Sequence, residues 1–136
     1  MTDHVRAIFE RAGLAYRPNP GVVPNSRLAL RLTELARDRG LHEPVHERLM
    51  DAYWAEGRNI GDPEVLRALA AEAGLTELDG VFEGDAYEDR VRASTEQAQT
   101  LGIHAIPAFV LDSKLLILGA QPREVFEQAF ERLATG

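Results

Sequence analysis

Apolar residues recur every three or four positions through most of the chain, which is the spacing of one face of an α-helix. Glycines at the ends of these stretches, and Asp62 directly before Pro63, predict where helices stop and start. The expected helices cover about residues 2–12, 26–39, 44–56, 62–73 and 85–101, and a short additional helix begins at Thr76. Three prolines from Arg17 to Pro24 exclude a helix in that segment.

The periodicity changes after Gly102. Two mostly apolar runs, Ala108–Leu111 and Lys114–Leu118, lack the helical spacing and predict a hairpin of two strands joined at Asp112-Ser113. Gln121-Pro122 then precedes a last amphipathic helix. The residues expected to face inward on that helix are Val125, Phe126, Ala129, Phe130 and Leu133. The fold class is therefore α/β and mostly helical.

The predicted hairpin is incomplete as a sheet. A two-stranded hairpin is only marginally stable in water, and strands this apolar require cover on their faces. Lys114 can protect one edge, but Ala108–Leu111 carries no charge that would keep another strand away. We therefore expect a partner at this edge. A homodimer that joins two copies edge to edge about a two-fold axis would supply one.

Composition narrows the function classes. The chain has 136 residues, one domain's worth, and a net charge of −7, which argues against a surface that binds nucleic-acid phosphates. The first residues, Met1 to Arg6, do not resemble a secretion signal. The most apolar stretch, Ile103 to Leu118, is interrupted by Pro107 and charged residues and is not expected to enter a membrane. We expect the protein in the cytoplasm.

Cysteine is absent from the sequence. The chain by itself therefore has no disulfide, no thiolate zinc site, no cysteine nucleophile and no Cys-x-x-Cys redox motif. No glycine-rich phosphate loop is present either, since the glycines fall singly at predicted helix ends. The sequence predicts no cofactor and no metal.

One motif points to zinc. His42-Glu43-Pro44-Val45-His46 matches the H-E-x-x-H pattern of zinc proteases, in which both histidines lie on one helix face. Proline is favoured only in a helix's first turn, so we expect His42 to precede the helix and the shared face to be lost. We interpret the two histidines as solvated residues at a helix start. A zinc enzyme through this motif is the alternative.

A second segment, Gly102 to Val110, points to peptide binding. Pro107 stands directly before an apolar strand, and the Ile106-Pro107 bond is a candidate for the cis isomer. A sharp turn there would expose the backbone N–H and C=O of Ile106 to an extended peptide. We predict a peptide-binding site at Ala105, Ile106 and Pro107. The alternative is a trans proline that only ends the preceding helix.

These residues carry a family resemblance. The pattern Gly102-x-x-x-Ile106-Pro107-Ala108-Phe109-Val110, followed by Gly119-Ala120-Gln121-Pro122, resembles the C-terminal part of DsbA-like thiol oxidoreductases of the FrnE type. Upstream, Pro24-Asn25-Ser26 and the run from Ala52 to Pro63 resemble that family's helical insertion. The chain is less similar to 2-hydroxychromene-2-carboxylate isomerases and kappa-class glutathione transferases.

The resemblance implies an incomplete thioredoxin-like fold. Residues 14–101 would be the helical insertion, and 102–136 the cis-proline loop, hairpin and C-terminal helix of one truncated domain. Pro107 would be the cis-proline, and the backbone of Ile106 would pair with substrate. The first β-α-β unit with its Cys-x-x-Cys has no counterpart in this sequence. The chain is then either a fragment of a longer enzyme or a half-domain without redox activity.

Three function classes follow. The first is a cysteine-free member of the oxidoreductase family that requires a cysteine-bearing N-terminal half. The second is a homodimeric module that binds an extended peptide or protein through the Pro107 loop or the open strand edge. The third is the zinc enzyme. Whether this chain is an enzyme is left open by the sequence.

Overall fold

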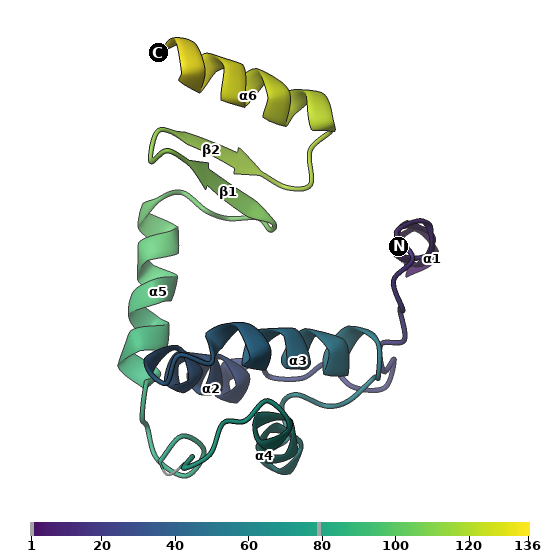
Figure 1. Ribbon diagram of the computed structural model, residues 1–136, viewed down its shortest axis with the longest axis vertical. Coiled ribbons are helices and arrows are strands. Elements are labelled where there is room, and N and C mark those ends of the chain that lie inside the picture. The colour runs from purple at the N-terminus through teal and green to yellow at the C-terminus, as the bar shows by residue number, and fades with distance from the viewer. Residues whose placement is uncertain (1, 79) are drawn as a thin grey trace. The chain divides into compact units, whose positions relative to one another are not determined.

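The computed structural model describes residues 2–78 and 80–136 (Figure 1). Its elements follow the predicted order of helices, hairpin and final helix, which confirms the mostly helical α/β fold class. They are α1 (Thr2–Arg11), α2 (Arg27–Asp38), α3 (His42–Trp54), α4 (Pro63–Glu72), α5 (Glu88–Thr100), β1 (Ala108–Leu111), β2 (Leu115–Leu118) and α6 (Arg123–Thr135). None of these helices is long and apolar enough to cross a lipid bilayer.

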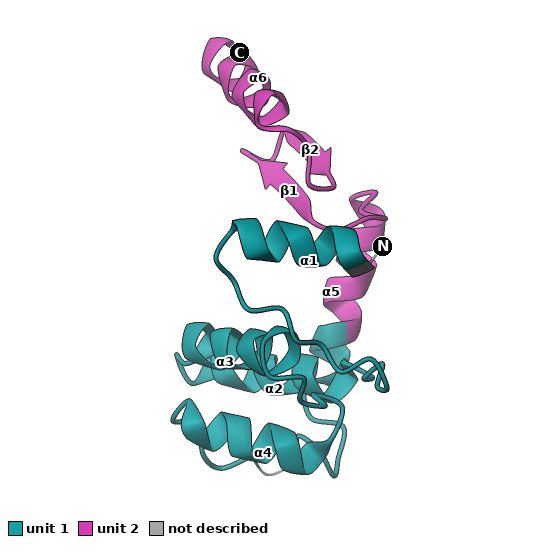
Figure 2. Cartoon of the chain, turned by 90° about the vertical axis from the view of Figure 1, so that its right-hand side faces the viewer, with its two compact units in different colours: residues 1–91 teal, residues 92–136 magenta. Residues whose placement is uncertain are grey.

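The chain divides into two compact units, residues 1–91 and residues 92–136 (Figure 2). The boundary falls inside α5, directly after Val91. The thioredoxin-like division after residue 101 that the resemblance implies stays a prediction.

The first unit is built on α2, α3 and α4, which pack against one another. Each helix contributes residues at helical spacing to a common core, because three- and four-residue steps return a side chain to the same face. The largest fully buried side chains are Leu32, Val45, Leu66, Leu69, Leu75 and Val81. The predicted start of α4 is confirmed: Asp62 caps the helix by accepting a hydrogen bond of 2.9 Å from the Glu64 N–H, with Pro63 next to it.

The short helix predicted at Thr76 is wrong. Neither residues 75–78 nor residues 80–87 form a helix, and Glu77 and Tyr87 have left-handed φ angles of 58° and 67°. The segment is instead held by a side chain. The buried Arg31 donates to the carbonyl oxygens of Gly80, Gly84 and Ala86. In a helix these carbonyls would accept from backbone N–H groups, whereas here a side chain of α2 supplies the donors.

The second unit contains the hairpin and α6. The strands are antiparallel, with Ala108 opposite Leu118 and Leu111 opposite Leu115. Both turn residues, Asp112 and Ser113, have left-handed φ angles, of 51° and 53°, and the Lys114 N–H donates to the Leu111 carbonyl at 2.9 Å. Such backbone twist suits a tight hairpin turn.

The expected inward face of α6 is only partly covered. Phe126 makes an edge-on contact with Phe109 of β1, with ring centroids 5.0 Å apart. Val125 and Phe130, also predicted to face inward, are exposed. Within residues 92–136 the one buried hydrophobic side chain is Ile117. The prediction failed here because the amphipathic pattern reports which face can be buried, whereas burial also requires a partner surface.

Candidate functional site

The candidate peptide-binding loop begins where α5 ends. Gly102, with φ of 78°, turns the chain away from the helix, and the Ile103 N–H donates to the Ala98 carbonyl at 2.9 Å. The ring Nδ1 of His104 lies 2.9 Å from the Gly102 carbonyl oxygen. These contacts fix the chain direction just before Ala105.

The loop is also fixed on its far side. The Ile106–Pro107 peptide bond is cis, and the Pro107 carbonyl accepts a hydrogen bond of 2.6 Å from the Gly119 N–H at the end of β2. The Gln121 side chain donates from Nε2 to the Leu118 carbonyl at 2.7 Å. The loop and the turn that follows β2 therefore form one hydrogen-bonded end of the hairpin.

Ala105, Ile106 and Pro107 lie together on the surface of this end. The Ile106 side chain is 89% exposed, and Ala105 and Pro107 are exposed as well. Neither the N–H nor the C=O of Ile106 makes a hydrogen bond with a described residue. The arrangement leaves one backbone donor and one acceptor available to an extended chain. Binding of a peptide by these residues stays a prediction.

The outer edge of β1 begins beside this loop. In an antiparallel pair, alternate residues direct their backbone groups to the partner strand and away from it. Because Gly119 bonds to Pro107, Phe109 and Leu111 face β2, whereas Ala108 and Val110 face outward. The sheet contains these two strands among the described residues, so the outward groups of β1 have no strand beside them.

The structure corrects the expectation for the His-Glu-x-x-His segment. α3 begins at His42, two residues before Pro44, and both histidines lie on the same helix face. Their rings stack with centroids 5.7 Å apart and planes 9° apart. Pro44 is accommodated because the first intrahelical bond joins the Val45 N–H to the Leu41 carbonyl, and the residues before Val45 need no donor.

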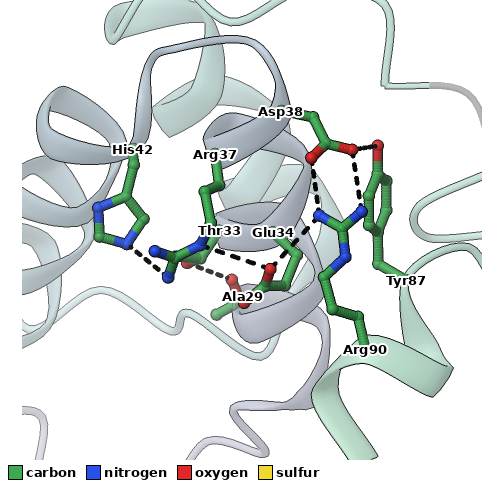
Figure 3. Close-up of polar contacts among 8 residues, drawn as sticks. All are labelled: Ala29, Thr33, Glu34, Arg37, Asp38, His42, Tyr87 and Arg90. Carbon is green, nitrogen blue, oxygen red and sulfur yellow. Dashed lines mark hydrogen bonds and ion pairs between the residues drawn. The ribbon is translucent and has the colours of Figure 1, made fainter. Parts of the chain in front are cut away.

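This face nevertheless offers poor ligands to a metal. The Nε2 of His42 lies 3.2 Å from a guanidinium nitrogen of Arg37 (Figure 3). A cation approaching that nitrogen would meet a positive charge first. The described residues also bring no cluster of three or more His, Asp or Glu side chains into metal-binding geometry. The arrangement therefore gives the zinc alternative no support beyond the motif itself.

The same view contains a polar cluster that the sequence pattern did not reveal. Arg90 of α5 forms a two-pronged ion pair with Asp38 at the end of α2, at 2.7 and 3.2 Å (Figure 3). The Tyr87 hydroxyl donates to the same carboxylate at 2.9 Å. Hydrogen bonds from Arg90 and then Tyr87 lower the pKa of Asp38. Residues 52 apart in sequence supply this contact, and no local spacing signals it.

Within the first unit, aromatic contacts join α1 to the end of α3. Phe9 of α1 lies 4.8 Å from Tyr16 and 5.9 Å from Trp54, measured between ring centroids. The Arg17 N–H donates to the Trp54 carbonyl at 2.6 Å. These contacts show that Trp54 serves packing of the first unit.

Comparison with known proteins identifies the family of this chain. A crystal structure of a probable DsbA oxidoreductase from Streptomyces coelicolor superposes with a TM-score of 0.83 at 36% sequence identity and covers 96% of this chain. The chain matches the family model of the DSBA-like thioredoxin domain over residues 1–131 and belongs to that family. The resemblance seen in the sequence is confirmed at this level.

The chain is shorter than the proteins that it matches. The uncharacterized protein YwbO of Bacillus subtilis is 29% identical over 129 residues, which cover 92% of this chain but 64% of that protein. The match to the Streptomyces structure covers 57% of that chain. The sequence thus spans roughly three-fifths of the length of these two proteins.

Proposed function

We propose that the chain forms the peptide-binding part of a thiol–disulfide oxidoreductase of the FrnE type. Ile106 would hold an extended segment of substrate through its backbone N–H and C=O. The observation that carries this proposal is the exposed, unpaired backbone of Ile106 beside Pro107 in a member of the DsbA-like family. Pairing of this kind fixes the position of a substrate irrespective of its side chains.

The redox step itself requires a second component. Disulfide exchange begins when a thiolate attacks a sulfur of the disulfide, and these residues contain no cysteine. A cysteine-bearing N-terminal half must supply both thiols, as part of a longer chain or as a separate protein. The outer edge of β1, with Val110 49% exposed and Phe109 39% exposed, is where we place that half. Its strand would cover apolar surface and complete the sheet.

The peptide-binding step can be tested with the chain as it is. The probe is the insulin B chain with its cysteines carboxymethylated, titrated into ¹⁵N-labelled protein. We expect amide shift changes centred on His104 to Ala108. An Ile106→Pro variant removes the N–H and should weaken binding about fivefold, since a lost hydrogen bond contributes on the order of 1 kcal/mol.

Val23→Pro is the matched control. Val23 is 96% exposed, precedes a proline as Ile106 does, and its N–H also makes no hydrogen bond with a described residue. The Val23→Pro variant should bind the probe with the same affinity as the unaltered chain. Shift changes confined to other regions, or equal affinity of both variants, would remove the site from Ile106. Circular dichroism establishes that each variant is folded.

A homodimer is the second candidate. The observation in its favour is the outward-facing backbone of Ala108 and Val110, which could pair with the same strand of another copy. Sedimentation equilibrium at micromolar concentration measures this directly. Dimers that Val110→Pro abolishes would support edge pairing, and a folded monomer throughout that range would exclude it.

A further inference from the structure

The second unit has another free edge, on β2. By the alternation set by the Gly119–Pro107 bond, Leu116 and Leu118 direct their backbone groups away from β1. The Leu118 carbonyl is already taken by the Gln121 side chain. The N–H and C=O of Leu116 and the N–H of Leu118 therefore remain, among the described residues, for a third strand.

A groove runs along this edge between β2 and α6. It has a volume of about 280 Å³, and its walls include Leu115 and Ile117 from the strand and Val125 and Ala129 from the helix. An adjoining hollow of about 310 Å³ continues toward the hairpin turn, and its lining includes Lys114, Leu133 and Gly136. Apolar walls beside free backbone groups suit an extended chain with apolar side chains.

Positive charge gathers at the turn end of this groove. Arg132 lines both hollows, and no carboxylate of the described residues lies within ion-pair distance of its guanidinium. Lys114 stands beside it, with its ammonium 3.3 Å from Asp112. Because Asp112 pairs with Lys114, the guanidinium of Arg132 is the cation left for a ligand at this end, beside the carbonyl end of α6 with roughly half a negative elementary charge.

We propose that the groove between β2 and α6 binds the C-terminal segment of another polypeptide, with its terminal carboxylate on Arg132. The peptide adds a strand antiparallel to β2, so its end reaches the turn where the cations are. Leu116 supplies backbone hydrogen bonds, and the Arg132 guanidinium donates two parallel hydrogen bonds to the carboxylate oxygens. Arg132 and Lys114 lie at the turn end of the hairpin, opposite the Pro107 end, and the edge of β2 used here is not the backbone of Ile106 on which the proposed peptide site depends.

The test uses two fluorescein-labelled peptides of alternating Thr and Val, one with a free C-terminal carboxylate and one with a C-terminal amide. Anisotropy should show binding of the free acid at least about tenfold tighter than the amide. Arg132→Gln should remove that difference. Arg123→Gln removes the same charge from the same helix, where Arg123 pairs with Glu127 at 2.7 Å outside the groove, and should retain it.

Amide shifts identify the surface. The free-acid peptide should perturb Leu116 and Leu118 and leave Ile106 unchanged in ¹⁵N spectra of the whole chain. Equal affinity for acid and amide, or equal binding by Arg132→Gln and Arg123→Gln, overturns the proposal. An amidated peptide with an internal aspartate that binds as well as the free acid also overturns it, because the carboxylate would then not be terminal. None of these outcomes bears on binding at Ile106.

Discussion

The Nε of Arg31 lies 3.0 Å from the carbonyl oxygen of Ala86, and this contact joins α2 to the loop that precedes α5. Arg31 is 7% exposed, and its guanidinium also donates to the carbonyls of Gly80 and Gly84. A cation can be buried this way because three backbone dipoles replace the water that it loses.

Removal of this guanidinium should destabilise the first unit strongly. Arg31→Met leaves the carbonyls without donors, and we expect the free energy of unfolding to fall by about 3 kcal/mol. Arg31→Lys should restore little of it, since an ammonium lacks the planar fork. Urea denaturation measures both. Arg27→Met, which breaks an exposed pair with Glu88, should lose less than about 1 kcal/mol; a similar loss at both positions would contradict this role for Arg31.

Two glycines with the same backbone conformation should respond differently to substitution. Gly57 and Gly74 have φ of 66° and 83°, so Ala at either position costs about 1 kcal/mol in backbone strain. A Cβ on Gly57 would also lie 2.9 Å from the Arg17 carbonyl oxygen, whereas one on Gly74 would meet nothing within 4 Å. Urea denaturation should show Gly57→Ala to be clearly less stable than Gly74→Ala. Equal losses would mean that the segment around Arg17 moves aside freely.

Periodicity predicted the helices well because their stability comes from burying one apolar face. α2 and α4 contribute Leu32, Leu35, Leu66 and Leu69 to the core at the spacing seen in the sequence. The start of α4 was also predicted correctly from Asp62 and Pro63, because the helix cap depends only on residues next to each other in the sequence. The order of elements, and with it the fold class, could therefore be predicted.

One error arose where a distant group decides the local structure, and another where a local signal allows two helix starts. The segment after Thr76 was expected to be helical, but Arg31 of α2 satisfies its carbonyls. The start of α3 was placed after His42 because Pro44 was assigned to the first position, although the third is equally free of a hydrogen bond. The exposed backbone of Ile106 was expected from Pro107 alone, whereas the groove at Arg132 depends on how α6 lies beside β2.

Stability should fall in mild acid, with part of the fall due to Asp38. Hydrogen bonds from Arg90 and Tyr87 lower its pKa from an ordinary value of 3.8, so the unfolded chain binds its proton more readily than the folded one. The contribution is complete above about pH 5 and is lost as pH falls through 3.8 toward the lowered pKa of Asp38.

Arg90→Gln should reduce this acid dependence. Urea midpoints between pH 7 and pH 3 should decline less steeply below pH 4 in Arg90→Gln than in Arg11→Gln, whose guanidinium bonds only to the Ala7 carbonyl among the described residues. Arg48 lowers the pKa of Glu56 and Glu72 in the same way, from 4.5, so both variants keep that part of the decline. Parallel curves for the two variants would show that Asp38 does not contribute.

Zinc should leave the protein unchanged. Arg37 occupies the approach to His42 Nε2, so stoichiometric zinc added after chelator treatment is expected to produce no shift in thermal midpoint. The check is a comparison with His46→Ala, which should behave identically. A midpoint that rises with zinc in the unaltered chain and not in His46→Ala would restore the metal site.

The two units should differ sharply in local stability. α2, α3 and α4 share a buried core, whereas residues 92–136 bury Ile117 alone. Amides of β1, β2 and α6 should therefore exchange with solvent about a hundredfold or more faster than core amides of α2 and α4, after correction for intrinsic rates. Uniform protection would mean that the hairpin is stabilised beyond its own contacts.

Repeating the exchange at increasing protein concentration separates the partners proposed for β1. Protection of the Val110 amide rises with concentration if a second copy covers that edge and stays constant if the cysteine-bearing half is required.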